Sequence, residues 1–315
     1  MTNTTDPLIS ALRTISGPTV TSDRDDIGRG LFVGSGDSLA ACLLLERFGH
    51  RAQSAGDLAW IAGLPPGYDT VVGVSHSGRT AATVQAIEAA RTAGRRTVAV
   101  TANSSSPLAR AAHSTVLAPA IEVDEKIPAA GYIALALAAL AREGIDTRGA
   151  AAAVADGLAL LTDCPTPVDE RWPIYPPDAI SVLTLPDLRS AGDFWSLKLI
   201  EATGLCVRSV PLEEAGHVDY FIGPQSHLSI HLIGSQGTAR HHRLAQALAG
   251  NGHDVVSIAV PDPATAGDPM WSEIAMAAYG AYVAQETALR WDRPLFRGGE
   301  VPMDARHIQT PTDGP

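Results

Sequence analysis

The chain has 315 residues, of which 45% are hydrophobic, and this is enough to bury one large core or two of medium size. Its formal net charge is −11 and its Lys and Arg residues form no cluster, which excludes the basic surface of a nucleic-acid binder or of a protein drawn to anionic lipid. We therefore expect a small-molecule partner, with neither nucleic acid nor membrane as a partner.

The compartment is indicated by the cysteines and by the apolar segments. Cys42, Cys164 and Cys206 are odd in number and lie too far apart for a disulfide framework or a zinc site, so we interpret them as buried small apolar residues in a reducing compartment. The polar segment Met1–Asp6 lacks the pattern of a secretory signal. The apolar stretch Pro128–Ala141 is too short to span a bilayer and predicts a core helix. A cytoplasmic location is expected.

The first half of the chain alternates short β-branched runs with helical patterns. The predicted elements, in order, are helix Leu8–Ile15, strand Gly30–Val33, turn Gly34–Ser38, helix Leu39–Phe48, strand Asp69–Val74, loop Ser75–Thr80, helix Ala81–Thr92 and strand Thr97–Thr101. Ser106 and Pro107 then supply a cap and a first-turn proline for a further helix. Strands and helices of these lengths favour a parallel sheet covered by helices on both faces.

A proline-rich segment separates this half from a second one with a similar pattern. The second half predicts strand Ile180–Leu185, helix Asp193–Thr203, strand Cys206–Val210, strand His227–Ile233, loop Gly234–Thr238, helix Ala239–Ala249 and strand Asp254–Val260. The fold class is therefore α/β, with two doubly wound, flavodoxin-like parallel-sheet domains related by duplication. We predict an N-terminal helical arm at 1–29, a first domain at 30–162, a linker at 163–178 and a second domain at 179–315.

The loop Ser75–Thr80 has the composition of a phosphate cradle. A strand that ends in Ser-x-Ser-Gly-x-Thr and leads into a helix presents backbone N–H groups, three hydroxyls and the positive end of the helix dipole to one point. Gly78 allows the backbone to approach closely, and Arg79 can add a charge-assisted donor. The alternative is that Ser77 only caps the helix. The second-half loop Gly234–Thr238 lacks the first serine, so we expect it not to bind phosphate.

Several motifs together resemble a known family. In the first half these are Gly34–Ser38, Ser75–Thr80, Val98–Asn103 and Ser106–Ala109, whose order and spacing resemble the SIS (sugar isomerase) domain. In the second half they are Lys198–Glu201, Glu213–His217 and Trp291–Pro294, which resemble the isomerase domain of glucosamine-6-phosphate synthase and its relatives, the ketose/aldose isomerases and fructoselysine-phosphate deglycases. The likeness extends over two tandem SIS domains, roughly from Gly30 to Pro294.

The resemblance implies roles for particular residues. Those expected to bind a phosphosugar are Gly36, Ser38, Ser75, His76, Ser77, Gly78, Arg79 and Thr80. By the same resemblance Glu201 moves a proton between adjacent sugar carbons and His217 opens the ring, as suits a carboxylate and an imidazole. Lys198 is a further catalytic candidate, although it lies one turn before Glu201 and can neutralise it or hold a sugar hydroxyl. In the alternative, Glu201 is an ordinary helix-end carboxylate and His217 an ordinary loop histidine.

The sequence also departs from the family. His76 and Arg79 stand where relatives often carry Gln and Glu, which points to an unusual substrate, and Pro128–Gly131 replaces the usual Ser-Thr-Lys. The tail Leu295–Gly299 contains no lysine, which excludes imine catalysis from the tail, and no glutamine-hydrolysing domain is found, so we expect no glutamine amidotransferase activity.

These observations lead to one leading function and two alternatives. The leading one is a phosphosugar isomerase, acting on an aldose–ketose pair or on an amino-sugar phosphate by proton transfer through an enediol-type intermediate. The alternatives are an amino-sugar-phosphate deglycase or deaminase, and a non-catalytic phosphosugar sensor. The histidine pairs His241/His242 and His227/His231 do not favour a metal, so no metal or cofactor is expected. The resemblance further implies a homodimer with the active site at its interface, where His217 comes from the partner subunit.

Overall fold

The computed structural model describes residues 6–20, 28–60, 64–164, 168, 171–222, 226–261, 268–294 and 308. The chain divides into two compact units, each built around one β-sheet. The sheet-1 unit contains Ala11–Val123, Ala130–Ala151 and residue 308. The sheet-2 unit contains Asp124–Ala129 and the described residues from Ala152 to residue 294, together with residues 6–10. The predicted domain boundaries stay a prediction, and the proline-rich segment 163–178 is only partly described.

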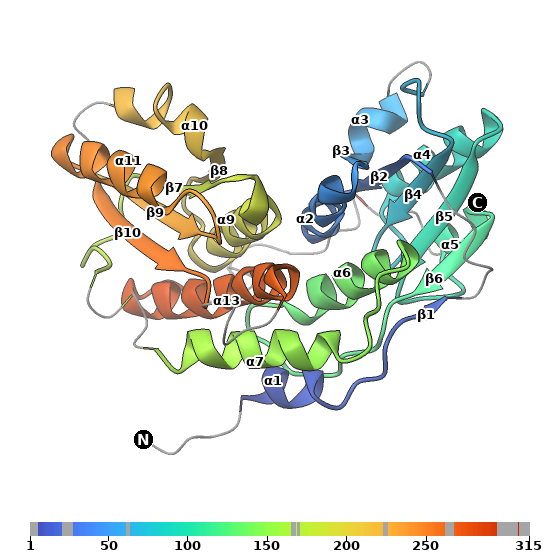
Figure 1. Ribbon diagram of the computed structural model, residues 1–315, viewed down its shortest axis with the longest axis horizontal. Coiled ribbons are helices and arrows are strands. Elements are labelled where there is room, and N and C mark those ends of the chain that lie inside the picture. Colours follow the sequence, from blue (N-terminus) through green and yellow to red (C-terminus); the bar gives the residue numbers. More distant parts are fainter. Residues whose placement is uncertain are drawn as a thin grey trace. The chain divides into compact units, whose positions relative to one another are not determined.

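Sheet 1 has six strands in the order β1-β6-β5-β4-β2-β3. Their bounds are β1 Thr19–Val20, β2 Gly30–Gly34, β3 Arg51–Ser54, β4 Thr70–Val74, β5 Arg96–Thr101 and β6 Ser114–Leu117. All neighbours are parallel except β1, which pairs antiparallel with β6. Every residue of β2 and β4 is buried, as expected for central strands of a parallel sheet that is covered on both faces (Figure 1).

Helices cover both faces of sheet 1. The helical elements of this unit are α1 Pro7–Leu12, which begins in the other unit, α2 Asp37–Leu43, the 3₁₀ turn η1 Leu44–Phe48, α3 Ala55–Trp60, α4 Ala81–Thr92, α5 Pro107–Ala111 and α6 Ala130–Arg142. One face of the sheet packs Leu31, Val71 and Ala99 against α3, α4 and α5. The helices α2 and α6 lie against each other and against the strands of the sheet. This is the doubly wound arrangement that the sequence predicts.

Sheet 2 has four parallel strands in the order β10-β9-β7-β8. Their bounds are β7 Ala179–Thr184, β8 Val207–Pro211, β9 His227–Ile233 and β10 Asp254–Ala259. The four strands β2 to β5 of sheet 1 lie in the order β5-β4-β2-β3. In sheet 2 the strands β7, β8, β9 and β10 take the places of β2, β3, β4 and β5, respectively. The two sheets therefore share one topology, as a duplication requires.

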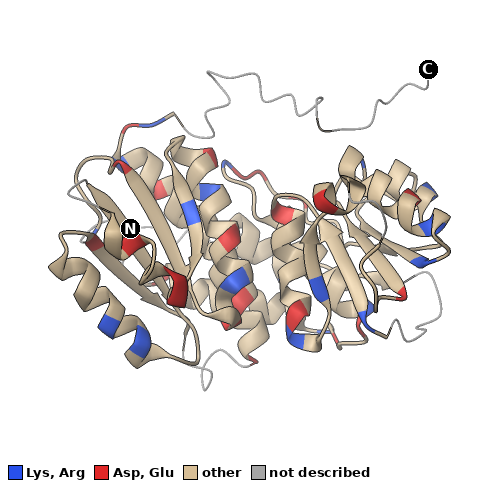
Figure 2. Cartoon of the chain, turned by 90° about the horizontal axis from the view of Figure 1, so that it is seen from above, with Lys and Arg blue, Asp and Glu red and all other residues tan. Residues whose placement is uncertain are grey.

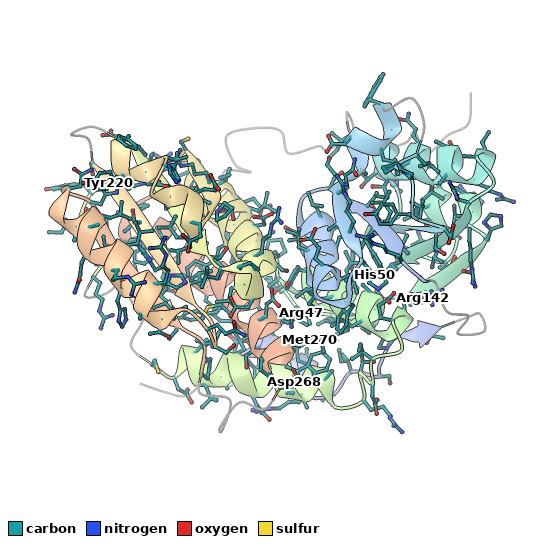
Figure 3. All side chains as sticks on the ribbon, turned by 45° about the horizontal axis from the view of Figure 1, so that its top comes forward. Arg47, His50, Arg142, Tyr220, Asp268 and Met270 are labelled. Carbon is teal, nitrogen blue, oxygen red and sulfur yellow. The ribbon has the colours of Figure 1, made fainter. Side chains whose placement is uncertain are left out.

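The helices of the sheet-2 unit include the longest of the described helices. They are α7 Ala150–Thr162, which begins in the sheet-1 unit, the 3₁₀ turn η2 Pro186–Leu188, α9 Arg189–Thr203, α10 Leu212–Ala215, the 3₁₀ turn η3 Asp219–Phe221, α11 Thr238–Gly250 and α13 Pro269–Arg290. Asp268 caps α13 by accepting from the Met270 amide at 2.9 Å, and both side chains are labelled at the start of that helix in Figure 3. Trp195 of α9 donates to the Met276 carbonyl at 2.7 Å and leaves no room for a side chain at Gly280, so α9 and α13 pack closely.

The structure corrects several details of the predicted elements. The helix predicted over Leu39–Phe48 begins at Asp37 and changes to a 3₁₀ turn at Leu44. The elements β3, α3, β6, α7 and α13 were not predicted from the sequence. The interpretation of the cysteines as buried holds for Cys42 but is wrong for Cys164 and Cys206, which are exposed. Neither of these two side chains lies in the core, because Cys164 follows the end of α7 and Cys206 precedes β8.

Charged side chains and helix lengths can be described over the same part of the chain. Over the described part of the chain, Lys and Arg are interspersed with Asp and Glu along the elements (Figure 2). Among the described helices, none combines the length and the apolar character needed to cross a bilayer.

A buried polar layer occupies part of one face of sheet 2, beside an apolar cluster that includes Leu183 and Val210. Ser181 of β7 donates to Asp219 Oδ1 at 2.5 Å and accepts from Arg208 Nε at 3.1 Å. Since Ser181 has a single hydroxyl proton, the contact at 3.0 Å to His227 Nε2 must be a bond that the imidazole donates. Arg208 Nη2 also donates to Asp219 at 2.7 Å. The carboxylate of Asp219, which is fully buried, is therefore paired and hydrogen-bonded.

The same face carries further histidines. The His231 and His241 Nδ1 atoms lie 3.3 Å apart, and His253 Nδ1 lies 3.0 Å from Ser229 Oγ. Burial lowers the pKa of His227 to about 4, of His231 to about 3 and of His241 to about 4. Neighbouring histidines lower each of these values further, whereas Asp219 raises those of His227 and His231. The layer is therefore built from neutral imidazoles.

This layer predicts that the protein loses stability in mild acid. The unfolded chain takes up protons on these histidines near pH 6.5 and the folded chain does so only near pH 3 to 4, so the free energy of unfolding falls as pH drops below about 6.5. The slope is up to about 1.4 kcal/mol per pH unit for each histidine. Urea unfolding followed between pH 8 and pH 5 measures it.

A pair of neighbouring variants isolates the contribution of the layer. His241→Asn removes one buried titrating group and should make the dependence on pH shallower, whereas His242→Asn, at the next and exposed position of α11, removes only a weaker charge effect on His241 and should change it much less. Equal slopes for the two variants would contradict the prediction.

Candidate functional site

The predicted phosphate loop Ser75–Thr80 lies at the topological switch point of sheet 1. It joins the carboxyl end of β4 to α4, and the loop that follows the adjacent strand β2 leads into α2. The chain proceeds from β2 to β3 on one side and from β4 to β5 on the other. Ligands of open parallel sheets bind at this position, outside the carboxyl ends of the strands where the strand order reverses.

The loop is fixed to the strand beside it. The Ser75 amide donates to the Val100 carbonyl at 3.0 Å. The His76 carbonyl accepts from the Ala102 amide at 3.0 Å and from Thr101 Oγ1 at 3.1 Å. Because the bonds to His76 use only its main chain, they hold the backbone of the loop and leave its side chain exposed to solvent.

Gly78 has a backbone conformation that favours glycine. Its φ is +65°, and a Cβ at this position would lie closer than 3.0 Å to Oγ and Cβ of Ser106 and to Thr101 Oγ1. Ser106 is itself fixed, because it caps α5 by accepting from the Ala109 amide at 3.2 Å. The Gly78 carbonyl in turn accepts from Leu108 at 3.0 Å. The turn therefore depends on a glycine and on its contact with the start of α5.

The hydroxyls of the loop are arranged around the first turn of α4. Ser75, which is 2% exposed, has its Oγ 3.1 Å from Thr80 Oγ1. Thr80, and not Ser77, is the N-cap residue of α4, and no side-chain capping bond is found there among the described residues. Ser77 Oγ instead accepts from the Arg79 amide at 3.3 Å, and the Ser77 side chain is exposed. The alternative in which Ser77 only caps the helix does not describe this arrangement.

Backbone donors of α4 complete the cradle. The first bond within the helix runs from the Val84 amide to the Thr80 carbonyl at 3.0 Å, so the amides of Ala81, Ala82 and Thr83 have no acceptor within the helix. These amides and the helix dipole favour an anion at the loop. The arrangement suits the phosphate group of a small ligand.

The loop after β2 lies beside the loop Ser75–Thr80 and is the second part of the candidate site. Gly36 is the N-cap of α2 with φ +57°, and the Ser38 amide donates to the Ser35 carbonyl at 3.2 Å. A Cβ on Gly34 would lie closer than 3.0 Å to the backbone of Ser38. Glycines therefore allow this tight turn, and Gly36 and Ser38 lie at the same edge of the sheet as Ser75–Thr80, as predicted from the motifs.

His76 lies against the start of α6. A Cβ on Gly131 would be 3.5 Å from His76 Cδ2, so the imidazole contacts the first turn of this helix. Partial desolvation by the surrounding protein lowers the pKa of His76 below its usual value, and the negative charge of Asp37 opposes this shift. Asp37 lies in the first turn of α2 and was not among the predicted site residues, although it is part of the quoted glycine-serine motif.

The three predicted catalytic residues belong to the sheet-2 unit. Lys198 of α9 is fully buried, with its Nζ 2.9 Å from Glu201 Oε2 and 4.9 Å from the centre of the Phe194 ring. The Glu201 side chain is 27% exposed. His217 follows α10, is exposed, and donates its amide to the Glu214 carbonyl at 2.8 Å. Lys198 and Glu201 are thus brought together as an ion pair in the last turns of α9.

The other predicted motifs occupy well-defined places. The Trp291–Pro294 segment is fixed to the end of α9, because Arg293 Nε donates to the Thr203 carbonyl at 2.8 Å. The tail Leu295–Gly299 lies outside the described residues. Over the described chain, no group of three or more His, Cys, Asp or Glu side chains is placed to hold a metal ion.

Residues 68–140 match the SIS domain family. The segment contains three of the four motifs on which the resemblance of the first half rests, Ser75–Thr80, Val98–Asn103 and Ser106–Ala109, whereas Gly34–Ser38 lies before it. A curated relative, the N-acetylmuramic acid 6-phosphate etherase of Symbiobacterium thermophilum, is 51% identical over 71 residues. This match spans 22% of this chain and 22% of the relative, about a fifth of its length.

Solved structures resemble the chain over most of its length. The C-terminal domain of glucosamine-fructose-6-phosphate aminotransferase from Francisella tularensis has a TM-score of 0.69 at 11% identity, covering 92% of this chain and 94% of that one. Tagatose-6-phosphate ketose/aldose isomerase from Escherichia coli has a TM-score of 0.67 at 18% identity, covering 91% and 86%. Glucosamine-6-phosphate deaminase from Thermotoga maritima has 0.65 at 14%, covering 92% and 93%. Because these identities lie between 11% and 18%, the structural matches show that the folds are similar and carry no statement about the reaction.

The geometry of Gly78 predicts a strong effect of one methyl group. We expect Gly78→Ala to cost roughly 2–5 kcal/mol in the free energy of unfolding, because the left-handed backbone and the collision with Ser106 both oppose a Cβ. Gly94→Ala is the matched control, since Gly94 has φ +73° and nothing within 4 Å of its Cβ position; we expect it to cost about 1 kcal/mol. Urea unfolding compares the two, and an equal cost would show that the close approach is unimportant.

Proposed function

We propose that the chain is a phosphosugar isomerase that holds the phosphate of its substrate on the loop Ser75–Thr80 and moves a proton between adjacent sugar carbons. The observation that carries this proposal is the fixed loop at the switch point of sheet 1, in which Gly78 brings the backbone close to α5 while hydroxyls and the amides of α4 remain for an anion. The match of residues 68–140 to the SIS domain supports the same chemistry.

Phosphate recognition follows from the donors of the loop. The hydroxyls of Ser75, Ser77 and Thr80 and the amides of the first turn of α4 are donors for the phosphate oxygens, and the dipole of this helix of 12 residues adds a favourable field. Arg79, which is partly exposed, supplies a positive charge beside them. The sugar then extends toward Gly36 and Ser38 in the loop after β2, with His76 at the start of α6.

Proton transfer is assigned to Glu201. Removal of a proton beside a carbonyl requires a carboxylate that stays ionised near neutral pH, and the ammonium group of Lys198 at 2.9 Å favours the ionised form. The Lys198 side chain is fully buried, which leaves its amine engaged with Glu201 and unsuited to forming an imine with a substrate. We therefore assign Lys198 as a positioning residue and Glu201 as the base.

Ring opening is assigned to His217. The exposed imidazole after α10 can protonate a ring oxygen while its backbone stays fixed by the bond to Glu214. We further propose a homodimer in which His217 reaches the active site from the partner subunit. Loss of specific activity on dilution below the dissociation constant of the dimer is the expected consequence.

One product assay distinguishes isomerisation from the other reactions of phosphosugars. The neighbours include a deaminase and a ketose/aldose isomerase, and the etherase shares 51% identity over its matched segment. The chain should therefore be incubated with fructose 6-phosphate, glucosamine 6-phosphate, fructosamine 6-phosphates and N-acetylmuramic acid 6-phosphate, with products followed by mass. Binding without turnover of any of these would favour the sensor alternative.

Phosphate anchoring predicts a loss of binding when two hydroxyls are removed. Each hydrogen bond to a charged group contributes about 1.5–3 kcal/mol, so Ser77→Ala combined with Thr80→Ala should weaken binding of fructose 6-phosphate about 100-fold or more in calorimetry. Thr92→Ala, which removes an exposed hydroxyl from the last turn of the same helix, should leave affinity unchanged. Unaltered affinity in the double variant would exclude the loop as the anchor.

The pairing of Glu201 with Lys198 predicts two different kinetic effects. Glu201→Gln should lower kcat by roughly 10²–10⁴-fold while phosphosugar binding persists. Lys198→Met keeps a side chain of similar length but removes the charge that holds the carboxylate ionised, so the acidic limb of the kcat/KM profile should move to higher pH. Kinetics between pH 5 and pH 9 distinguish the two, and equal turnover by wild type and Glu201→Gln would exclude the assigned base.

A further inference from the structure

The switch point of sheet 2 corresponds to the phosphate site of sheet 1. The shared strand order places the loop after β9 where sheet 1 has the loop after β4, and each is adjacent to the loop after the preceding central strand, β7 or β2. Each loop opens a long helix, α4 with 12 residues or α11 with 13. By topology, the loop Gly234–Thr238 is therefore the counterpart of Ser75–Thr80.

Each of the two loops contains a glycine with positive φ at the same distance from the end of its strand. Gly78 follows the last residue of β4, Val74, by four positions, and Gly237 follows the last residue of β9, Ile233, by the same number. Both glycines have positive φ, +65° and +73°. This correspondence aligns Gly234 with Ser75, the buried serine of the phosphate loop.

The surroundings of the two loops differ in chemistry. Near Gly78 the closest groups to an added Cβ are the hydroxyl-bearing side chains of Ser106 and Thr101. Near Gly237 the closest group is the Leu185 side chain, and near Gly234 it is the carboxylate of Asp187, whose Oδ2 lies closer than 3.0 Å to the Cβ position. A carboxylate thus lies where the first loop has the side chain of its serine.

This carboxylate comes from the loop after β7. In sheet 1 the equivalent loop after β2 turns at Gly36 and also carries a carboxylate, because Asp37 follows the end of β2 by three residues as Asp187 follows the end of β7, and its charge acts on His76. The side chains of His76 and Ser77 are exposed, so the first loop remains accessible to solvent. In sheet 2 the loop forms the 3₁₀ turn η2 Pro186–Leu188, which carries Asp187 to the backbone of Gly234. The side chain of Leu185 fills the remaining space beside Gly237.

We propose that Asp187 is the built-in anion of a second phosphate-type site, which it keeps closed, so that the chain holds one phosphate and not two. An anion that belongs to the chain is present at high effective concentration, and it repels a second anion that approaches the same loop and helix dipole. The ligand class that the closed loop excludes is inorganic phosphate and the phosphate group of sugars. Leu185 adds a steric obstacle to the electrostatic one.

The test removes the carboxylate in a background that lacks the first anchor. In the Ser77→Ala/Thr80→Ala variant, the melting temperature should not respond to inorganic phosphate beyond the response to sodium chloride of equal ionic strength. Adding Asp187→Ala should introduce a phosphate-dependent rise in melting temperature and a phosphate binding event in calorimetry. Asp254→Ala, which removes a carboxylate at the start of β10, should introduce neither.

Two outcomes would overturn the proposal. One is that phosphate stabilises neither Asp187→Ala nor the milder Asp187→Ser variant, each checked for folding by circular dichroism. The other is that phosphate stabilises the background while Asp187 is intact. Both are distinct from failure of the proposed function, which would appear as no binding of phosphosugar by the wild-type chain and would leave the comparison of Asp187 variants unaffected.

Discussion

The close approach of Gly78 to Ser106 is the constraint on which the candidate phosphate site depends. Without a side chain at residue 78 the loop can turn with positive φ and lie directly on the start of α5. The bond from the Leu108 amide to the Gly78 carbonyl then ties the loop to that helix, and the bonds from Thr101 and Ala102 to His76 tie it to the end of β5. Backbone donors aimed at a ligand are useful only when they are preorganised, because a mobile loop loses entropy on binding.

A parallel sheet explains why such a loop can be formed at all. Central strands with buried residues on both faces bring their carboxyl ends to one edge, so the loops after β2 and β4 become neighbours although about 40 residues separate them. The helices that follow begin at the same edge and direct their unpaired amides toward it. The chemistry of the site is therefore a product of topology before any side chain is chosen, and sheet 2 repeats that topology with different side chains.

Those side chains give the two sheets different cores. Sheet 1 packs aliphatic residues against α3, α4 and α5, whereas one face of sheet 2 carries Ser181, Arg208 and His227 around the buried carboxylate of Asp219. A buried charge requires hydrogen-bond partners, and the two that donate to Asp219 Oδ1, Ser181 and Arg208, come from two different strands. This layer specifies the packing of η3 and α11 on the sheet, at the cost of sensitivity to acid.

Much of the fold, and the position of the loop Ser75–Thr80 within it, could be predicted from the sequence because local patterns encode them. Val71, Val72 and Val74 read as a buried strand, and Ser106 with Pro107 reads as a helix start, since each signal lies within a few residues. Strand β3, Arg51–Ser54, was missed because three of its four residues are polar and it lies at the edge of the sheet. Helix α13 was missed because its small residues give a weak periodicity; its burial against α9 is tertiary information.

The chemistry of the site was harder to predict than its position, because it depends on contacts between residues far apart in the sequence. The contact between His76 and Gly131 joins residues 55 positions apart, and neither residue carries a local signal of the other. The same holds for Asp187 and Gly234, where the sequence indicates only a missing serine. A missing hydroxyl weakens an anion site, but a carboxylate placed in the same space reverses the charge that the site presents. The sequence difference at residue 234 is thus small, and only the approach of Asp187 in η2 to Gly234, just after the end of β9, connects this residue with the carboxylate.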